Sequence, residues 1–272
     1  MVAVTVTFSE NVTVTGTPQL TLETGSSDAV VDYSSGSGGA TLTFNYTVAS
    51  GNLNTDLDYA STSALALNSG TIRDAASNNA TLTLPTPGAS GSLAANKALI
   101  ADGILPVISS VSLAANNSSI AVTMSEAVYN TNGGSGALEA SDFFVVIGGG
   151  QATLSSGTPT SISSSGNVYT LGLGLSGTPN GSEVVTVAPI GSAIYDVAGN
   201  VASTSQSNNT ATMTDAFPPT FSSVTLAADN STIAVTTSEA VFSTSSGSGV
   251  LTVADFVLSL SCLLYTSPSP RD

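Results

Sequence analysis

The phrase VTVTFSENV at Val4–Val12 recurs as IAVTMSEAV at Ile120–Val128 and as IAVTTSEAV at Ile233–Val241. In each copy, apolar residues alternate with small or polar residues until a Ser-Glu pair is reached. This alternation gives an extended chain one apolar face and one polar face, which is typical of a half-buried β-strand. We therefore expect three equivalent strands, each followed by a turn that carries a carboxylate.

The second and third copies lie inside a longer match that needs no gap. Pro106 corresponds to Pro219, and Glu126 corresponds to Glu239, at one constant separation (219 − 106 = 113). The first and second copies of the phrase are separated by a similar length (120 − 4 = 116). A repeat of this size is too long for a solenoid unit and matches a whole small β-sandwich domain. The sequence therefore predicts an array of like all-β domains.

The two ends of the array are expected to be incomplete. A strand-like run that follows a proline precedes the phrase in the second and third copies, at Val107–Leu113 and Thr220–Leu226, but only Met1–Ala3 precedes it in the first. The first domain is therefore expected to lack its opening strand. The third copy stops after about half a sandwich and is expected not to bury a core of its own.

These observations predict four segments. Residues 1–103 form a β-sandwich without its opening strand, residues 104–217 a complete one, residues 218–261 a partial repeat, and residues 262–272 a non-native tail. The tail, Cys262–Asp272, resembles the translation of a sequencing-library adapter. On that interpretation the natural chain has no cysteine, and disulfides do not contribute to its stability. The alternative is a genuine tail rich in proline and serine.

Strand candidates follow the same alternation inside each domain. The run Ala40–Val48 alternates throughout, so its even-numbered residues are expected to share one face. A closing strand is expected at Ala80–Leu84, and residues 85–98, rich in Pro, Gly and Ser, are expected to hold little regular structure. Strands of the second domain are expected at Val107–Leu113, Ser119–Met124, Phe143–Ile147, Ala152–Leu154, Val168–Leu173, Val184–Val187 and Thr210–Thr214. Aromatic residues on strands, Phe144 among them, are expected to pack in cores.

Composition and charge restrict the possible partners. The 272-residue chain holds 18 acidic and three basic residues, for a net charge of −15. So negative a surface repels phosphate backbones and anionic lipids, so neither nucleic acids nor membrane surfaces are expected partners. No apolar run approaches the roughly 20 residues of a membrane helix, so membrane insertion is not expected.

The residue types needed for common catalytic sites are missing. The chain has no histidine, one cysteine at Cys262 and one lysine at Lys97. These counts exclude Ser-His-Asp, Cys-His and zinc-histidine sites. The many serines lack the neighbouring base that a nucleophile needs. We predict that the chain is not an enzyme and that it has no catalytic residues.

Three phrases together resemble the tandem bacterial immunoglobulin-like (Big) domains of large surface and adhesin proteins. They are the V-x-V-T-F-S-E-x-V strand and turn, the I-x-D-x-A-G-N turn at Ile194–Asn200, and a D-x-x-x-P junction at Asp102–Pro106 and Asp215–Pro219. The resemblance extends to about Ser261. It implies tandem immunoglobulin-like β-sandwiches in an extracellular or cell-surface protein, where such arrays commonly form a stalk or an adhesive region.

The strand connectivity of an immunoglobulin-like sandwich brings three acidic residues to one pole of the second domain. They are Asp102 in the linker, Glu126 after the second strand and Asp196 in the turn before the last strand. Carboxylates from distant segments that meet at a domain junction suit a hard, oxygen-seeking cation, because their mutual repulsion needs a counter-charge. We therefore predict a Ca²⁺ site here, which would stiffen the joint between neighbouring repeats.

The other copies carry parts of the same acidic set. The equivalent residues are Asp215 and Glu239 in the third copy, and Glu10 and Asp74 in the first. An alternative interpretation needs no metal: Asp196 and Asp74 accept hydrogen bonds from turn backbone, and the glutamates are solvated. Gly199 is expected to have a positive φ in this turn, and Ser77 at the equivalent place makes the turn costlier.

Two functions of different classes are compatible with these patterns. The first is a non-enzymatic spacer, stalk or adhesive segment of a bacterial cell-surface or secreted protein, with neighbouring repeats and surface glycans or proteins as partners. The second is a carbohydrate-binding β-sandwich module. Coplanar exposed aromatic rings on one sheet face would favour the second function, whereas aromatic rings buried between sheets would favour the first.

Overall fold

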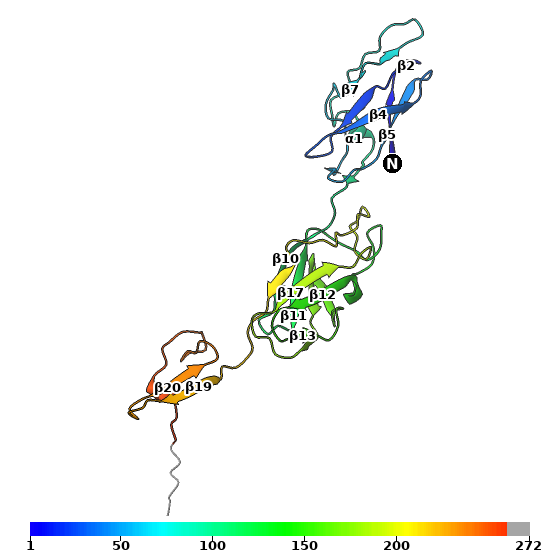
Figure 1. Cartoon of the computed structure of the whole chain (residues 1–272). Helices are drawn as coiled ribbons and strands as arrows, with labels where there is room; N and C mark the ends of the chain where they lie inside the picture. Colours follow the sequence, from blue (N-terminus) through cyan, green and yellow to red (C-terminus); the bar gives the residue numbers. More distant parts are fainter. Residues whose placement is uncertain (260–272) are drawn as a thin grey trace, which may run out of the picture. The chain divides into compact units, whose positions relative to one another are not determined.

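The computed structural model describes residues 1–259, which are nearly all β (Figure 1). Strands account for 36% of these described residues and helices for 4%, and the sheets are antiparallel. The predicted all-β class is thus confirmed. The chain divides into two compact units, the first at Met1–Asp215 and the second beginning at Ala216. Because the first unit holds two separate hydrophobic cores, we call residues 1–103 the first module and residues 104–215 the second module.

The first module is built around one five-stranded sheet. Its order is β1 (Val2–Thr7), β5 (Thr41–Tyr46), β4 (Ala29–Ser35), β3 (Gln19–Leu22) and β7 (Leu65–Ala66). Two small ladders complete it, β2 (Thr13–Thr15) with β8 (Thr71–Arg73) and β6 (Leu53–Asn54) with β9 (Ala101–Asp102). A four-residue helix, α1 (Leu93–Asn96), lies in the segment rich in Pro, Gly and Ser.

The core of the first module follows the predicted alternation. On β5, Leu42, Phe44 and Tyr46 are buried, and Val4 on β1 is buried opposite Phe44. The closing strand expected at Ala80–Leu84 was wrong: Leu82 and Leu84 still pack against the core, but the segment joins no ladder. Alternation decides which face is buried, whereas a strand also needs a neighbouring strand for its backbone hydrogen bonds.

The second module contains two larger sheets. One has the order β10 (Ile108–Leu113), β11 (Ser119–Met124), β15 (Val168–Gly172) and β14 (Ile162–Ser165). The other has the order β12 (Phe143–Gly148), β17 (Val184–Pro189) and β18 (Thr210–Thr212). Minor elements are the ladder of β13 (Thr153–Leu154) with β16 (Leu175–Ser176) and the 3₁₀-helix η1 (Ala140–Asp142). The strand expected at Ser119–Met124 has the predicted bounds.

Both larger sheets contribute to one core, so they face each other. Phe143 on β12 lies 6.2 Å from Tyr169 on β15, measured between ring centroids. The expectation that Phe144 packs in the core was wrong, because its side chain is 46% exposed. Phe143 and Val145 point inward on this strand, so the alternation sends Phe144 and Val146 outward. Even in a continuous apolar run, therefore, only every second side chain of the strand faces the core.

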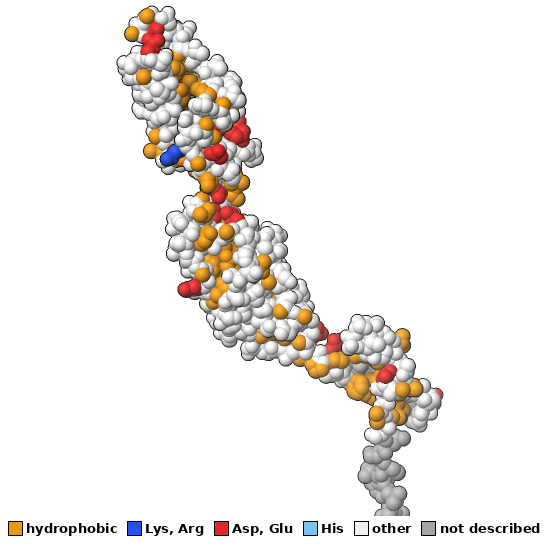
Figure 2. Space-filling view, turned by 180° about the vertical axis from the view of Figure 1, so that it is seen from behind, with side chains coloured by type: hydrophobic (Ala, Val, Ile, Leu, Met, Phe, Trp, Pro, Cys, Tyr) orange, Lys and Arg blue, Asp and Glu red, His pale blue; other side chains and the backbone are white. Residues whose placement is uncertain are grey.

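The C-terminal unit is described to residue 259 and is a hairpin of β19 (Phe221–Leu226) and β20 (Ile233–Thr237), followed by the 3₁₀-helix η2 (Val253–Asp255). Its apolar side chains are largely exposed (Figure 2). Val224 pairs with Val235 in β19–β20 as Val111 pairs with Val122 in β10–β11, and both ladders have a register shift at the same place. The adapter-like tail lies outside the described residues. None of the described helices has the length and hydropathy of a membrane-spanning segment.

Candidate metal centre

A short backbone pairing brings the turn after β11 close to the turn before the last strand. The N–H of Tyr129 donates to the carbonyl oxygen of Tyr195 at 2.7 Å, and the N–H of Tyr195 donates to the carbonyl oxygen of Tyr129 at 2.8 Å. Glu126 lies three residues before Tyr129, and Asp196 directly follows Tyr195. This pairing therefore holds both carboxylates at the same pole of the second module.

Asp196 organises a tight turn that ends at Asn200. Its carboxylate accepts hydrogen bonds from the backbone N–H of Asn200 at 2.8 Å and from the side-chain amide of Asn200 at 2.7 Å. Gly199 has a φ of 91°, as expected, which places it in the left-handed region where glycine is favoured. Asp196 is completely buried.

Asp102 arrives from the first module. Asp102 is the last residue of β9 and pairs with Leu53 on β6, so its backbone belongs to the first module. The side-chain amide of Asn200 also donates to the carbonyl oxygen of Asp102 at 3.0 Å. Asn200 therefore ties the end of the first module to the turn that holds Asp196.

Asp102, Glu126 and Asp196 meet at this junction, with one carboxylate oxygen from each lying within 4.8 Å of the others. Asp102 and Glu126 are half-buried. Burial raises the pKa of Glu126, and the negative charges of Asp196 and Asp102 raise it further. The predicted repulsion between the carboxylates therefore acts on Glu126, since no positive charge is among the causes of its pKa shift.

The donor set fits a hard cation. All three side chains offer carboxylate oxygen, the ligand that Ca²⁺ prefers, and a divalent ion would offset most of their combined charge. The hydrogen bonds to Asp196 also match the alternative, in which this residue only shapes the turn. The two functions are compatible, because an ionised carboxylate has about four acceptor positions and Asn200 occupies two of them.

The other predicted acidic residues form no comparable group within residues 1–259. Glu10 and Asp74 line one surface hollow, but no third carboxylate joins them. Asp215 is exposed and lies beside Gly181 in the first unit. Glu239 is half-buried in the C-terminal unit, where its backbone carbonyl accepts a hydrogen bond from the hydroxyl of Thr237.

Two further buried carboxylates have no counterpart among the predicted site residues. Glu183 is fully buried and accepts hydrogen bonds from the backbone N–H groups of Gln151, Ala152 and Asn180. Burial opposes its ionisation, but the backbone donors outweigh burial and lower the pKa of Glu183 to about 2. Asp58 in the first module is the second example.

Asp58 accepts hydrogen bonds from three backbone N–H groups, those of Tyr59, Gly88 and Leu93. Burial again opposes ionisation, but hydrogen bonding, led by Gly88 and Tyr59, lowers the pKa of Asp58 below its usual value. Both carboxylates hold loops to the sheets. Most of their donors lie far away in the sequence with no recognisable spacing, so the sequence carried no signal for either.

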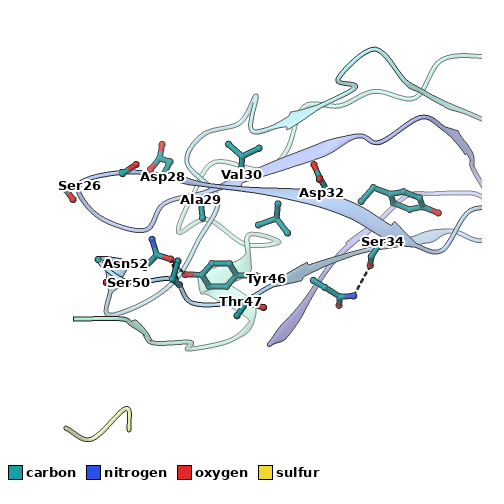
Figure 3. Close-up of a pocket in the computed structure, with 16 residues that line it drawn as sticks. Ser26, Asp28, Ala29, Val30, Asp32, Ser34, Tyr46, Thr47, Ser50 and Asn52 are labelled. Atoms are coloured by element: carbon teal, nitrogen blue, oxygen red, sulfur yellow. Dashed lines mark hydrogen bonds between the residues drawn. The ribbon is translucent and has the colours of Figure 1, made fainter. Parts of the chain in front are cut away.

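A hollow of about 750 Å³ beside β4 and β5 tests the carbohydrate alternative (Figure 3). Two aromatic residues line this hollow. Tyr33 is half-buried and packs edge-on against Phe44, with 6.3 Å between the ring centroids. Tyr46 is 2% exposed, and its hydroxyl donates to the side chain of Asn52 at 3.0 Å. The amide of Asn52 in turn donates to Thr24 at 3.2 Å. The ring of Tyr46 therefore belongs to the core and offers no flat surface for stacking a sugar.

Comparison with known proteins gave no match. Neither a protein-family model, nor a curated protein, nor a solved structure is significantly similar to this chain.

Proposed function

We propose that this chain is a non-enzymatic structural segment of a large bacterial cell-surface or secreted protein, built from immunoglobulin-like repeats and serving as a spacer or adhesive stalk. The matching registers of β10–β11 and β19–β20 support the repeat, because sequence copies 113 residues apart (224 − 111 = 113) form the same ladder. The three phrases shared with bacterial immunoglobulin-like domains support the class of protein. Burial of Phe44, Tyr46 and Phe143 favours this function over carbohydrate binding.

The observation that carries the proposal is the group of three carboxylates at the junction of the two modules. Asp102 is anchored in the first module, whereas Glu126 and Asp196 belong to the second. A Ca²⁺ ion bound by all three would link the modules and remove the repulsion that raises the pKa of Glu126. Restricting the joint is what a spacer that transmits force requires.

Calorimetric titration of the calcium-free chain, with small-angle scattering in Ca²⁺ and in chelator, tests this proposal. We expect one Ca²⁺ ion to bind and the radius of gyration to change on binding. Glu126→Gln removes one ligand and should weaken binding at least about tenfold, the equivalent of one charged contact. The matched control is Glu10→Gln, which alters the corresponding residue of the first module and should bind as the wild type does.

Because the chain carries many other carboxylates, Ca²⁺ could bind away from the junction, and the two variants distinguish these cases. If Glu10→Gln and Glu126→Gln bind Ca²⁺ equally, the ion binds elsewhere and the junction site is wrong. Identical scattering in Ca²⁺ and in chelator would rule out a calcium-stiffened joint.

A further inference from the structure

One edge of the main sheet in the first module is open. β1 pairs with β5 on one side and is the terminal strand of its sheet. The N–H of Phe8 donates to Ala40, so the even-numbered residues of β1 exchange ladder bonds with β5. The backbone groups of Ala3, Thr5 and Thr7 therefore point away from β5, toward the open edge.

A groove of about 540 Å³ runs beside this edge. All residues from Val2 to Phe8 line it, together with Thr83 and Leu84. Leu93 and Leu99 add apolar surface. The groove thus combines unpaired strand backbone with apolar side chains, the two features that an added β-strand requires.

A strand occupies the equivalent place in the second module. β11 corresponds to β1, and it pairs with β15 on one side and with β10 on the other. β10 also contacts β18, the strand that corresponds to the Ala80–Leu84 segment. The second module therefore displays the geometry that an occupant of the groove would adopt, with Ser112 opposite Ala121 as the template for pairing to Thr5.

A second strand of the β10 type exists in the chain and is poorly buried. β19 has the sequence FSSVTL where β10 has ISSVSL. Phe221 is 65% exposed, whereas its counterpart Ile108 is 1% exposed in the core of the second module. Val224 and Leu226 are each 59% exposed.

We propose that the groove beside β1 accepts β19 of a second copy of this chain, which exchanges its partner β20 for β1. β1 and β20 are copies of the same phrase, so the ladder bonds lost to β20 are replaced one for one by bonds to β1. The exchange buries Phe221, Val224 and Leu226 in the groove, and this apolar burial is the driving force. The contact is heterologous and can join copies head to tail.

Sedimentation of the intact chain, with reductant present to keep Cys262 from cross-linking, tests the proposal. The wild type is expected to self-associate as its concentration rises. Thr5→Pro removes the N–H that points to the open edge, and it is expected to weaken association at least about tenfold. Thr5→Ala is the matched control, because it changes the same exposed side chain but keeps the N–H, and it should associate normally.

Val224→Asp tests the donor strand, since it places a charge on the face that enters the groove. It should be monomeric alone, as should Thr5→Pro. An equimolar mixture of the two should form dimers and nothing larger, because Val224→Asp keeps an intact groove and Thr5→Pro keeps an intact β19. Circular dichroism of Thr5→Pro should show that its sheets remain folded.

Three results would overturn the proposal. The wild type could stay monomeric at all concentrations, the mixture could fail to form dimers, or Thr5→Pro could associate as strongly as Thr5→Ala. The last result would mean that the exposed apolar face of the hairpin associates without using the edge of β1.

Discussion

Each module of the first unit contains a copy of the same turn, but the residues around the two copies differ. Asp74 accepts hydrogen bonds from the backbone and side-chain amides of Asn78 at 2.8 and 2.7 Å, the same distances found between Asp196 and Asn200. Thr13 pairs with Arg73 before the first turn, as Tyr129 pairs with Tyr195 before the second. Among the described residues, only the second turn has a third carboxylate beside it.

The local phrase is therefore sufficient for the turn but not for a metal centre. The turn closes through bonds within five residues, so it forms wherever the phrase occurs. The acidic group forms only where a separate segment, ending at Asp102, reaches the same pole and is held there by Asn200. A copy of the phrase therefore predicts the turn, whereas the site depends on the neighbour that precedes it.

The largest effect is expected at Glu183, the buried carboxylate that anchors loops in the second module. Glu183→Gln replaces a charged acceptor of three backbone N–H groups with an amide that can present a donor to them. We expect it to lower the unfolding midpoint of the second module more than Gly199→Ser does. Urea unfolding at neutral pH, followed by hydrogen exchange in each module, measures this.

The pH dependence gives an independent check on Glu183. Its pKa lies at about 2 in the folded protein, below the usual 4.5, so its contribution to stability is fully present above pH 4.5. That contribution is lost as the pH falls from 4.5 toward 2. Glu183→Gln should therefore differ most from the wild type at neutral pH and least near pH 2; an equal difference at both values would contradict the assignment.

The turns themselves provide a reciprocal exchange of intermediate size. Ser77 has a φ of 74° where Gly199 has 91°. Gly199→Ser should cost about 1–2 kcal/mol from the left-handed backbone alone, and a β-carbon there would also come within 2.4 Å of the side-chain oxygen of Asn132. Ser77→Gly relieves the same strain and should gain up to about 1 kcal/mol, less the added entropy of the unfolded chain.

Thermal unfolding of each single variant measures these changes. The double variant, Ser77→Gly with Gly199→Ser, should show the sum of the two effects, because the residues lie in modules with separate cores. A gain of stability from Gly199→Ser would show that the two turns differ in backbone conformation.

The strands and the junction were predictable because their signals are local or repeated. Alternation over Ala40–Val48 identifies the buried face of β5, and the repeated Ser-Glu phrase places Glu126 at the end of β11. Once the turn phrase is recognised, sheet topology is enough to bring Asp196 to the same pole as Asp102. The predicted neighbours therefore followed from order along the chain and required no knowledge of side-chain packing.

The failures share a different cause, since each depends on contacts that no local pattern encodes. Ala80–Leu84 alternates as a strand should, but no neighbouring strand supplies a ladder. Phe144 lies in a continuous apolar run, where alternation cannot show which residues face the core. Glu183 and Asp58 looked like ordinary surface acids, because backbone donors to them come from loops far away in the sequence.

The smallest effect compares Glu126 with Glu10 in the absence of calcium. Burial and two negative neighbours raise the pKa of Glu126, so the folded state favours its protonated form. Protonated Glu126 therefore contributes to the free energy of unfolding below its usual pKa of 4.5, and this contribution is lost as the pH rises through the raised pKa of the folded protein. With chelator at neutral pH, Glu126→Gln should therefore stabilise the second module by up to about 1 kcal/mol.

Glu10→Gln is the control for this substitution, since Glu10 is exposed and shares its hollow with one carboxylate, Asp74. It should change the unfolding midpoint little at any pH. Adding Ca²⁺ should reverse the order, because the ion stabilises the wild type through Glu126 and gains less from the amide. A stabilising effect of Glu126→Gln that persists in saturating Ca²⁺ would mean that the three carboxylates repel one another without ever sharing an ion.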